Sequence, residues 1–284
     1  MHAPLNNASI QEIFGTSRKD LVAQIDRHTL KVQAWLSSRS PQAKRFEGKG
    51  IRASSTGFKI PLLNLALGCN FPSDASEQDI KEEIQSVKEF FADRQVPWYW
   101  WMNTNPSPRN IRAVLEDLGF EYNDPPLPAM AAVLSTDLSL PPHPEKIHVW
   151  QAGSVDDLRA ASKIRRVAFR FREGEALSYF EDMATDWLND PDVKLFLAGE
   201  TESEPVSIGV LINCAGIPGV YVMATLPEHH RKGYGKAILA RIMNEATQQG
   251  HKILALTASE AGFGLYSQFG FHHIFGFDFY TLKP

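Results

Sequence analysis

The apolar residues of the first half predict helices and strands in alternation. In residues 1–40, charged residues separate the apolar positions Leu21, Ile25, Leu30, Val32 and Leu36, which favours a helix or a helix pair. Residues 46–71 contain two β-like runs between glycine turns. Further on, the pattern predicts a capped helix over 76–91, an aromatic strand over 96–102, a short helix over 107–118 and a strand over 129–138.

The second half has the same alternation, with clearer boundaries. A strand at 147–150 precedes helices predicted over 155–172 and 176–189. The runs 193–199, 205–214 and 220–225 are joined by short turns, which suggests an antiparallel meander. After a glycine-containing loop we expect a helix to about residue 249, a strand over 253–257, a short helix over 261–269 and a terminal β-pair over 272–282.

A weak internal repeat relates the two halves. Leu115-Glu-Asp-Leu-Gly-Phe-Glu-Tyr corresponds to Tyr266-Ser-Gln-Phe-Gly-Phe-His-His, and similar elements surround each segment. Leu140-Pro-Pro-His-Pro-Glu is rich in proline and poor in apolar residues, as expected of a linker. We therefore predict a domain over 1–140, a linker over 141–146 and a second domain over 147–284, the alternative being a coincidental repeat.

The stretch from Val220 to Lys236 is typical of a strand, a basic glycine loop and a helix start. The amides at such a junction converge on one point, and the helix dipole adds positive potential there, so a phosphate could bind. Side chains at Gly233 or Gly235 would hold a diphosphate away from these amides. An ordinary turn is the alternative. The corresponding segment of the first half, 71–79, has no glycine and three acidic residues, so we expect that half to have kept the shape and lost the cofactor.

Composition limits the classes of function. The net charge of −4 over 284 residues argues against a general electrostatic grip on nucleic acid. We expect no secretory signal and no membrane span, because the apolar stretches are too short, and therefore a cytoplasmic protein. Cys69 and Cys214 fit a reducing compartment. The histidine pairs 229–230 and 272–273 lack the spacing of a zinc site, so no metal is expected.

Two motifs resemble those of the GNAT family, the acyl-CoA-dependent N-acyltransferases. Thr225-Leu-Pro-Glu-His-His-Arg-Lys-Gly-Tyr-Gly looks like the family's cofactor loop, and Leu265-Tyr-Ser-Gln-Phe-Gly-Phe looks like its second hallmark. The resemblance implies an α/β (α+β) fold of two tandem domains, each with a mixed, mostly antiparallel sheet flanked by helices. It covers residues 147–284 in detail and the first half as a degenerate copy.

The resemblance also implies the residues of the site. Acetyl-CoA would place its diphosphate on the amides of His230, Arg231, Lys232, Gly233, Tyr234, Gly235 and Lys236. Its pantetheine arm would pair with main chain near Met223 and Thr225, and Ser259 and Gly262 would line the approach. The thioester would lie between the strands 220–225 and 253–257, which must splay there, with a bulge near Ala224 and an oxyanion donor near Thr225.

Tyr266 is the candidate general acid at the departing sulfur. His230 departs from the family, which usually has Arg or Gln there, and this affects affinity more than activity. Glu173, Glu175 and Tyr221 are open candidates for the base. Half or more of the aromatic residues 98–101 are expected in the core, and the others could form a wall for the acceptor.

The leading interpretation is an N-acetyltransferase, monomeric or homodimeric, that acts on a primary amine of a small molecule or peptide. The alternative is a non-catalytic acyl-CoA-binding module. A third, an acyltransferase that acts on tRNA or protein, would need a basic surface at the cleft, and the acidic balance counts against tRNA.

Overall fold

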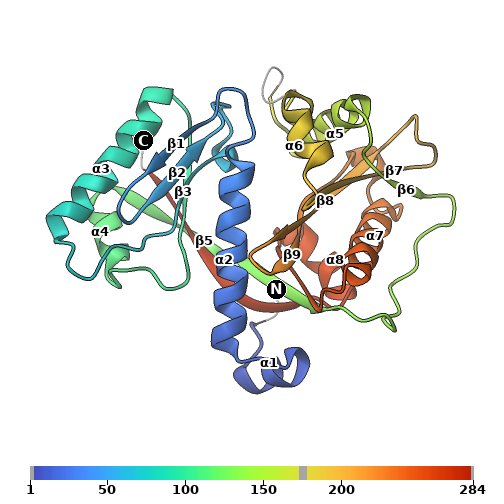
Figure 1. Ribbon diagram of the computed structural model, residues 1–284, viewed down its shortest axis with the longest axis horizontal. Coiled ribbons are helices and arrows are strands. Elements are labelled where there is room, and N and C mark those ends of the chain that lie inside the picture. The colour runs from blue at the N-terminus through green and yellow to red at the C-terminus, as the bar shows by residue number, and fades with distance from the viewer. Residues whose placement is uncertain (1–2, 173–177, 283–284) are drawn as a thin grey trace. The chain divides into compact units, whose positions relative to one another are not determined.

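The computed structural model describes residues 3–172 and 178–282, which form two compact units (Figure 1). The unit that we call the C-unit comprises Met1–His28 and Pro128–Phe275, and the N-unit comprises Thr29–Leu127 and Gly276–Pro284. Three elements contribute residues to both units, namely α2 (Arg18–Leu36), β5 (Phe120–Val133) and β11 (His272–Leu282).

In the N-unit the strands β1, β2, β3, β4 and β11 are neighbours in this order. The strands β1 (Lys44–Glu47), β2 (Arg52–Ser55) and β3 (Asn64–Leu67) are antiparallel, β4 (Tyr99–Trp101) is parallel to β3, and the end of β11 is antiparallel to β4. Its helices are α3 (Glu77–Arg94), α4 (Ile111–Asp117) and the 3-10 turn η1 (Pro61–Leu63). The apolar faces of α3 and α4 form its core with β3, β4 and β11.

In the C-unit the strands β6, β7, β8, β9, β10 and β5 are neighbours in this order. Its strands are β6 (His148–Gln151), β7 (Val193–Gly199), β8 (Ser207–Cys214), β9 (Ile217–Thr225) and β10 (Ile253–Thr257), with the end of β5. The strands from β6 to β9 are antiparallel, as predicted for the meander, whereas β10 is parallel to β9 and antiparallel to β5.

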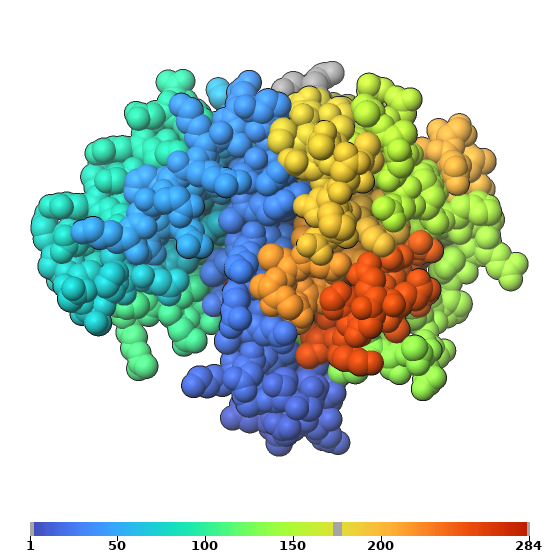
Figure 2. Space-filling model, in the orientation of Figure 1, coloured from blue at the N-terminus to red at the C-terminus, as the bar shows by residue number. Residues whose placement is uncertain are grey.

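Helices cover the sheet of the C-unit on two sides. Helices α7 (Tyr234–Gln248) and α8 (Glu260–Gln268) form one core cluster with the strands, whereas α5 (Val155–Ala168) packs against β8 and β9 and contributes no described residue to that cluster. Figure 1 shows α5 and α7 on opposite sides of β8. The outer faces of α7 and α8, orange-red in Figure 2, are exposed. The remaining elements are α1 (Asn7–Phe14), η2 (Glu181–Met183), α6 (Ala184–Asn189) and η3 (Pro227–His229).

The predicted repeat is present in both units. In each, antiparallel strands are followed by a helix and then by a strand parallel to the strand before that helix, namely β4 beside β3 and β10 beside β9. The next neighbour in the sheet is antiparallel to this strand. The last strand of each repeat is exchanged: β5 follows the first repeat in the chain but pairs with β10, and β11 follows the second repeat but pairs with β4. The compact units therefore do not follow the predicted boundary at 141–146.

Two details of the predicted elements are wrong. Residues 272–282 form the single strand β11 and no β-pair. Within the described part of 176–189, the helix α6 begins only at Ala184, after the 3-10 turn η2. Within the predicted linker, Pro144 packs closely against Gly233. No described helix is long and apolar enough to span a bilayer.

Candidate active site

Strands β9 and β10 form a fork. Among the described residues they pair only at Gly219 with Ala255 and at Val220 with Leu256. Beyond this point β9 continues to Thr225, still paired with β8, and β10 continues to Thr257, still paired with β5. Among the described residues, the edge of β9 from Tyr221 to Thr225 thus faces no strand on the β10 side, so β9 and β10 splay there, as the resemblance implied.

A bulge in β9 shapes the fork. Tyr221 pairs with Val210 and Ala224 with Ile208, so Val222 and Met223 together face Gly209. Val222 has a φ of 49°, which is unusual for a β-branched residue. The predicted bulge near Ala224 is thus present, one or two residues earlier. Because a bulge leaves an extra residue outside the ladder, we expect the oxyanion donor at the amide of Val222 or Met223 rather than near Thr225.

Gly209 makes room for the bulged strand. A Cβ at this position would lie 2.4 Å from Cγ2 of Ile238 in α7 and 2.5 Å from Sδ of Met223. Any larger residue would therefore push β8 away from α7 or displace the Met223 side chain. The glycine fixes the distance between the bulge and the helix that follows it.

Helix α7 begins without a side-chain cap. Its N-cap is Gly233, with a φ of 99°, and its first turn contains no acidic residue. A Cβ at Gly233 would lie 2.6 Å from Cδ of Pro144, so this glycine is required by the backbone and its packing. A Cβ at Gly235 would lie 3.5 Å from Cδ2 of Leu265 and 4.0 Å from Oγ1 of Thr225, both ordinary contacts. Gly235 is thus not required by the fold, and its small size keeps the first turn open to a ligand.

The predicted loop residues have different environments. The exposed His230 turns back, and its Nε2 donates to the main-chain oxygen of Thr225 at 2.9 Å. Tyr234 is buried, and its hydroxyl donates to Glu200 at 3.3 Å. Arg231 and Lys232 are exposed, and Lys236 is half-buried. The side chains of His230 and Tyr234 therefore brace the loop, and its cationic side chains are Arg231, Lys232 and Lys236.

Helix α8 holds Tyr266 in place. The N-cap Ser259 accepts a hydrogen bond from the amide of Gly262 at 3.2 Å, so this pair starts the helix. A Cβ at Gly262 would lie 2.9 Å from Cε2 of Tyr266, so the glycine accommodates the ring. At the other end, Gly270 has a φ of 78°, and the amide of Phe271 returns to the carbonyl of Tyr266 at 3.1 Å. Gly270 and Phe271 of the motif thus terminate the helix, and the ring of Phe271 packs against Tyr266.

Tyr266 is a buried, neutral phenol. Its side chain is 8% exposed and lies 5.9 Å from the ring of Phe271. Burial raises the pKa of Tyr266 to about 12, because the ionised form loses its hydration. The hydroxyl therefore keeps its proton at neutral pH and remains a hydrogen-bond donor.

The corresponding helix of the N-unit has its N-terminus filled. Ser76 caps α3 by accepting from the amide of Asp79, and Asp79 in turn accepts from the amide of Ser76 at 3.0 Å. The hydrogen bonds of the cap lower the pKa of Asp79, which stays ionised. The chain's own carboxylate thus occupies this helix N-terminus, and the loss of the cofactor from this half stays a prediction.

The other predicted residues are less clear candidates. Glu173 and Glu175 lie outside the described residues, and Tyr221 is 6% exposed. The aromatic run belongs mainly to the core of the N-unit, where Trp100 is fully buried and donates to the carbonyl of Gly68 at 2.9 Å. Trp98 stacks on Phe91 at 4.4 Å. These rings are therefore engaged in packing, as the core interpretation predicted.

Two polar residues with buried side chains escaped the sequence analysis. His28 lies on the apolar side of α2, and its Nδ1 donates to the carbonyl of Cys214 at 2.8 Å, while its Nε2 has no hydrogen-bond partner among the residues that the structure describes. Burial lowers the pKa of His28 to about 4, so the ring is neutral. Arg165 lies on the buried face of α5. Each falls at helical spacing from apolar positions, Leu21 and Leu158 among them, and this is the signal that could have revealed them.

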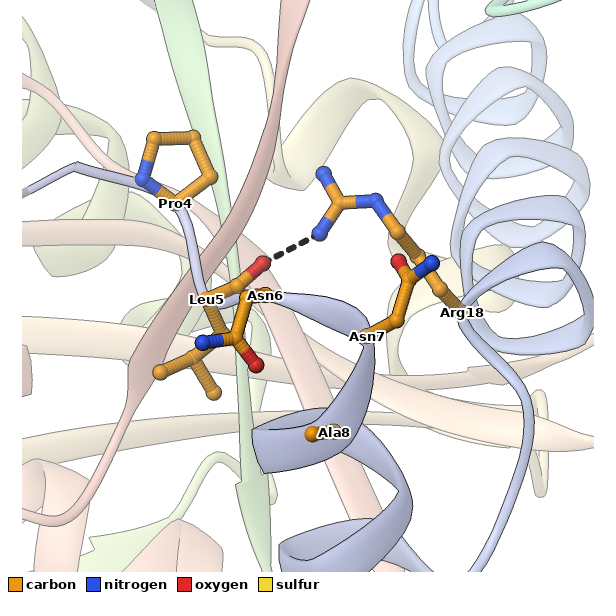
Figure 3. A pocket seen from close by; sticks show the side chains of 6 residues that line it. All are labelled: Pro4, Leu5, Asn6, Asn7, Ala8 and Arg18. Carbon is orange, nitrogen blue, oxygen red and sulfur yellow. Dashed lines mark hydrogen bonds between the residues drawn. The ribbon is translucent and has the colours of Figure 1, made fainter.

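A shallow pocket of about 530 Å³ lies elsewhere on the C-unit (Figure 3). It is lined by Pro4, Leu5, Asn6, Asn7, Ala8 and Arg18. Arg18 donates to the carbonyls of Leu5 and Ile274, the latter at 2.7 Å, and both of these acceptors are neutral. None of the predicted site residues lines this pocket. Within the described residues, no group of three or more His, Cys, Asp or Glu side chains is arranged to hold a metal ion.

Comparisons with known proteins agree with this geometry. Residues 197–274, which include the fork, α7 and α8, match the family model of the acetyltransferase (GNAT) domain. No curated protein matches the sequence significantly. A solved GCN5-related N-acetyltransferase from Kribbella flavida is similar over 90% of this chain and 95% of its own, with 17% identity and a TM-score of 0.64.

Two further solved structures show the same fold. A GCN5-related N-acetyltransferase from Sphaerobacter thermophilus has 18% identity and a TM-score of 0.60, covering 84% of this chain and 82% of its own. A tandem GNAT protein from the clavulanic acid biosynthesis pathway has 13% identity and a TM-score of 0.56, covering 94% and 96%. The GNAT family model thus matches residues 197–274, and the chain has the fold of solved GNAT proteins, a tandem one among them.

Proposed function

We propose that the C-unit is an acetyl-CoA-dependent N-acetyltransferase that acts on a primary amine of a small molecule or peptide. The observation that carries this proposal is the difference between two helix N-termini. The first turn of α7 has no side-chain cap and a glycine at 235, whereas the first turn of α3 is closed by Asp79. Of these two helix N-termini, that of α7 is the one whose main-chain donors are free of a side-chain cap and can bind a diphosphate.

The fork supports the placement of the rest of the donor. The edge of β9 from Tyr221 to Thr225 has no neighbouring strand on the β10 side, so the amide groups of a pantetheine arm can pair with it. The amine attacks the thioester carbonyl directly, and the amide at the Val222–Met223 bulge stabilises the developing oxyanion. Tyr266 donates a hydrogen bond to the departing sulfur.

Calorimetry with coenzyme A tests the diphosphate site. In Gly235→Glu a carboxylate occupies the first turn of α7, and we expect coenzyme A binding to be lost while the thermal unfolding temperature stays within a few degrees of wild type. Gly153→Glu is the matched control, since it adds the same side chain at an exposed glycine whose Cβ would meet nothing within 4 Å. Retained affinity in folded Gly235→Glu would place the diphosphate elsewhere.

Turnover distinguishes the enzyme from the alternative, a non-catalytic acyl-CoA-binding module. Wild-type protein is incubated with acetyl-CoA and a panel of amines, and the release of free thiol is measured. We expect release that depends on the amine. Tight coenzyme A binding without thiol release for any amine would instead indicate the binding module.

A further inference from the structure

Arg165 is a buried cation without an anionic partner among the described residues. It lies in the last turn of α5, on the same buried face as Leu158, Ala161 and Ser162, and its side chain is 6% exposed. Nε and Nη1 are both buried and have no hydrogen-bond partner within the described part of the chain. The structure thus buries a charge and leaves at least two of its donors unsatisfied.

Aromatic rings surround the guanidinium. Its Cζ lies 4.0 Å from the ring centroid of Tyr179, 5.3 Å from that of Phe171 and 5.8 Å from that of Phe180. Such stacking favours a cation, but it uses only the faces of the guanidinium. The N–H groups point outwards in the guanidinium plane, where they bind planar anions. The rings therefore hold Arg165 in place without satisfying its donors.

An unpaired buried ion is costly, and removal from water is compensated only by an anion or by good hydrogen bonds. Arginine retains its charge even when buried. Its donor geometry matches a carboxylate, to which it can form two parallel hydrogen bonds. A carboxylate is therefore the ligand group that fits these donors best.

The position of α5 connects this cation with the fork. The helix packs against β8 and β9, and Arg165 is on its buried face. Strand β9 is also the strand that leaves β10 after Val220 and carries the bulge. A ligand group bound at Arg165 would thus lie in the layer that covers the strand where acetyl transfer is proposed.

We propose that Arg165 binds the carboxylate of the acceptor, so that the substrate is an amine that also carries a carboxylate group, such as an amino acid or a short peptide. This inference rests on the proposed function, because it names the acceptor of that reaction. The amine would face the fork while the carboxylate is held at Nε and Nη1 of Arg165 beneath α5.

The first test compares wild-type protein with paired acceptors, a set of amino acids and their carboxamides, at saturating acetyl-CoA. We expect kcat/KM to favour the acids. In Arg165→Gln the kcat/KM for acids should fall by about 30-fold or more, mainly through KM, since a buried charge loses its partner. Carboxamides should change by less than about threefold. The amines of an acid and its carboxamide differ in basicity, but this difference is the same for both proteins. It therefore drops out when the ratio of kcat/KM for acid and carboxamide is compared between wild type and Arg165→Gln. Arg165→Lys, which retains the charge, should recover part of the ratio.

A binding measurement keeps the inference testable without turnover. Millimolar amino acids should raise the thermal unfolding temperature of wild type more than their carboxamides do, and Arg165→Gln should abolish the difference. Equal effects of acids and amides on wild type would overturn the inference even if no variant folds. If Arg165→Gln lowered kcat/KM equally for acids and carboxamides, with unchanged coenzyme A affinity, the inference would also be overturned, and the role of Arg165 would be packing. Failure of coenzyme A to bind wild type would refute the proposed function separately.

Discussion

Replacing Tyr266 by phenylalanine tests the chemistry of the fork, because it removes one hydroxyl and keeps the ring that packs on Phe271. A thiol has a pKa of ~8.5 and Tyr266 one of about 12, so complete proton transfer from the phenol to a thiolate would be uphill by ~5 kcal/mol. The phenol is therefore expected to act as a hydrogen-bond donor to the developing thiolate.

The size of the effect follows from that role. A hydrogen bond to a charged group contributes ~1.5–3 kcal/mol, so kcat should fall by ~10- to 150-fold in Tyr266→Phe. The loss should be independent of pH up to 9.5, where a phenol of pKa ~12 is ~0.3% ionised, against ~24% for an unperturbed tyrosine. Acetyl-CoA affinity should not change, because the contact strengthens only as the sulfur becomes charged.

The assay is thiol release at saturating acetyl-CoA and amine between pH 6.5 and 9.5, with calorimetry for coenzyme A affinity. Tyr280→Phe is the matched control, since it removes a phenol that is 2% exposed in the N-unit, where the hydroxyl accepts from Arg112 at 3.1 Å. A kcat of Tyr266→Phe within threefold of wild type would refute the assigned role. A wild-type advantage that disappears between pH 8 and 9.5 would refute the raised pKa.

Two further predictions concern stability. Burial lowers the pKa of His28 to about 4, from 6.5 in the unfolded chain, so the folded state binds fewer protons than the unfolded state. The free energy of unfolding therefore decreases as the pH falls from 6.5 towards 4, and at pH 5 the decrease is ~2 kcal/mol. His28→Asn, which retains a donor for the carbonyl of Cys214, should flatten this slope in urea titrations at pH 7.5 and 5, and an unchanged slope would exclude His28 as its source. The strand exchange predicts that residues 147–284 alone aggregate, because the edge of β10 from Ile253 to Thr257 loses its partner in β5. Residues 128–284, which retain that partner, should give more soluble monomer in size-exclusion chromatography, and equal yields would contradict this.

The sequence by itself determined the local elements and the two motifs of the site. The β-run before Pro227, the glycines of the loop and the helical spacing after Lys236 are local patterns, and each corresponds to the observed β9, loop and α7. The acidic segment at 71–79 likewise indicated a closed helix N-terminus, because a capping box is formed by residues three positions apart.

Only the tertiary structure decided which partners these elements find. Nothing local in Ala129–Val133 or in the end of β11 shows which strand each pairs with, since pairing depends on long-range contacts, and the exchange of β5 and β11 therefore escaped prediction. For the same reason the sequence did not reveal His28 and Arg165, whose polar groups acquire their importance only when a second segment of the chain buries them.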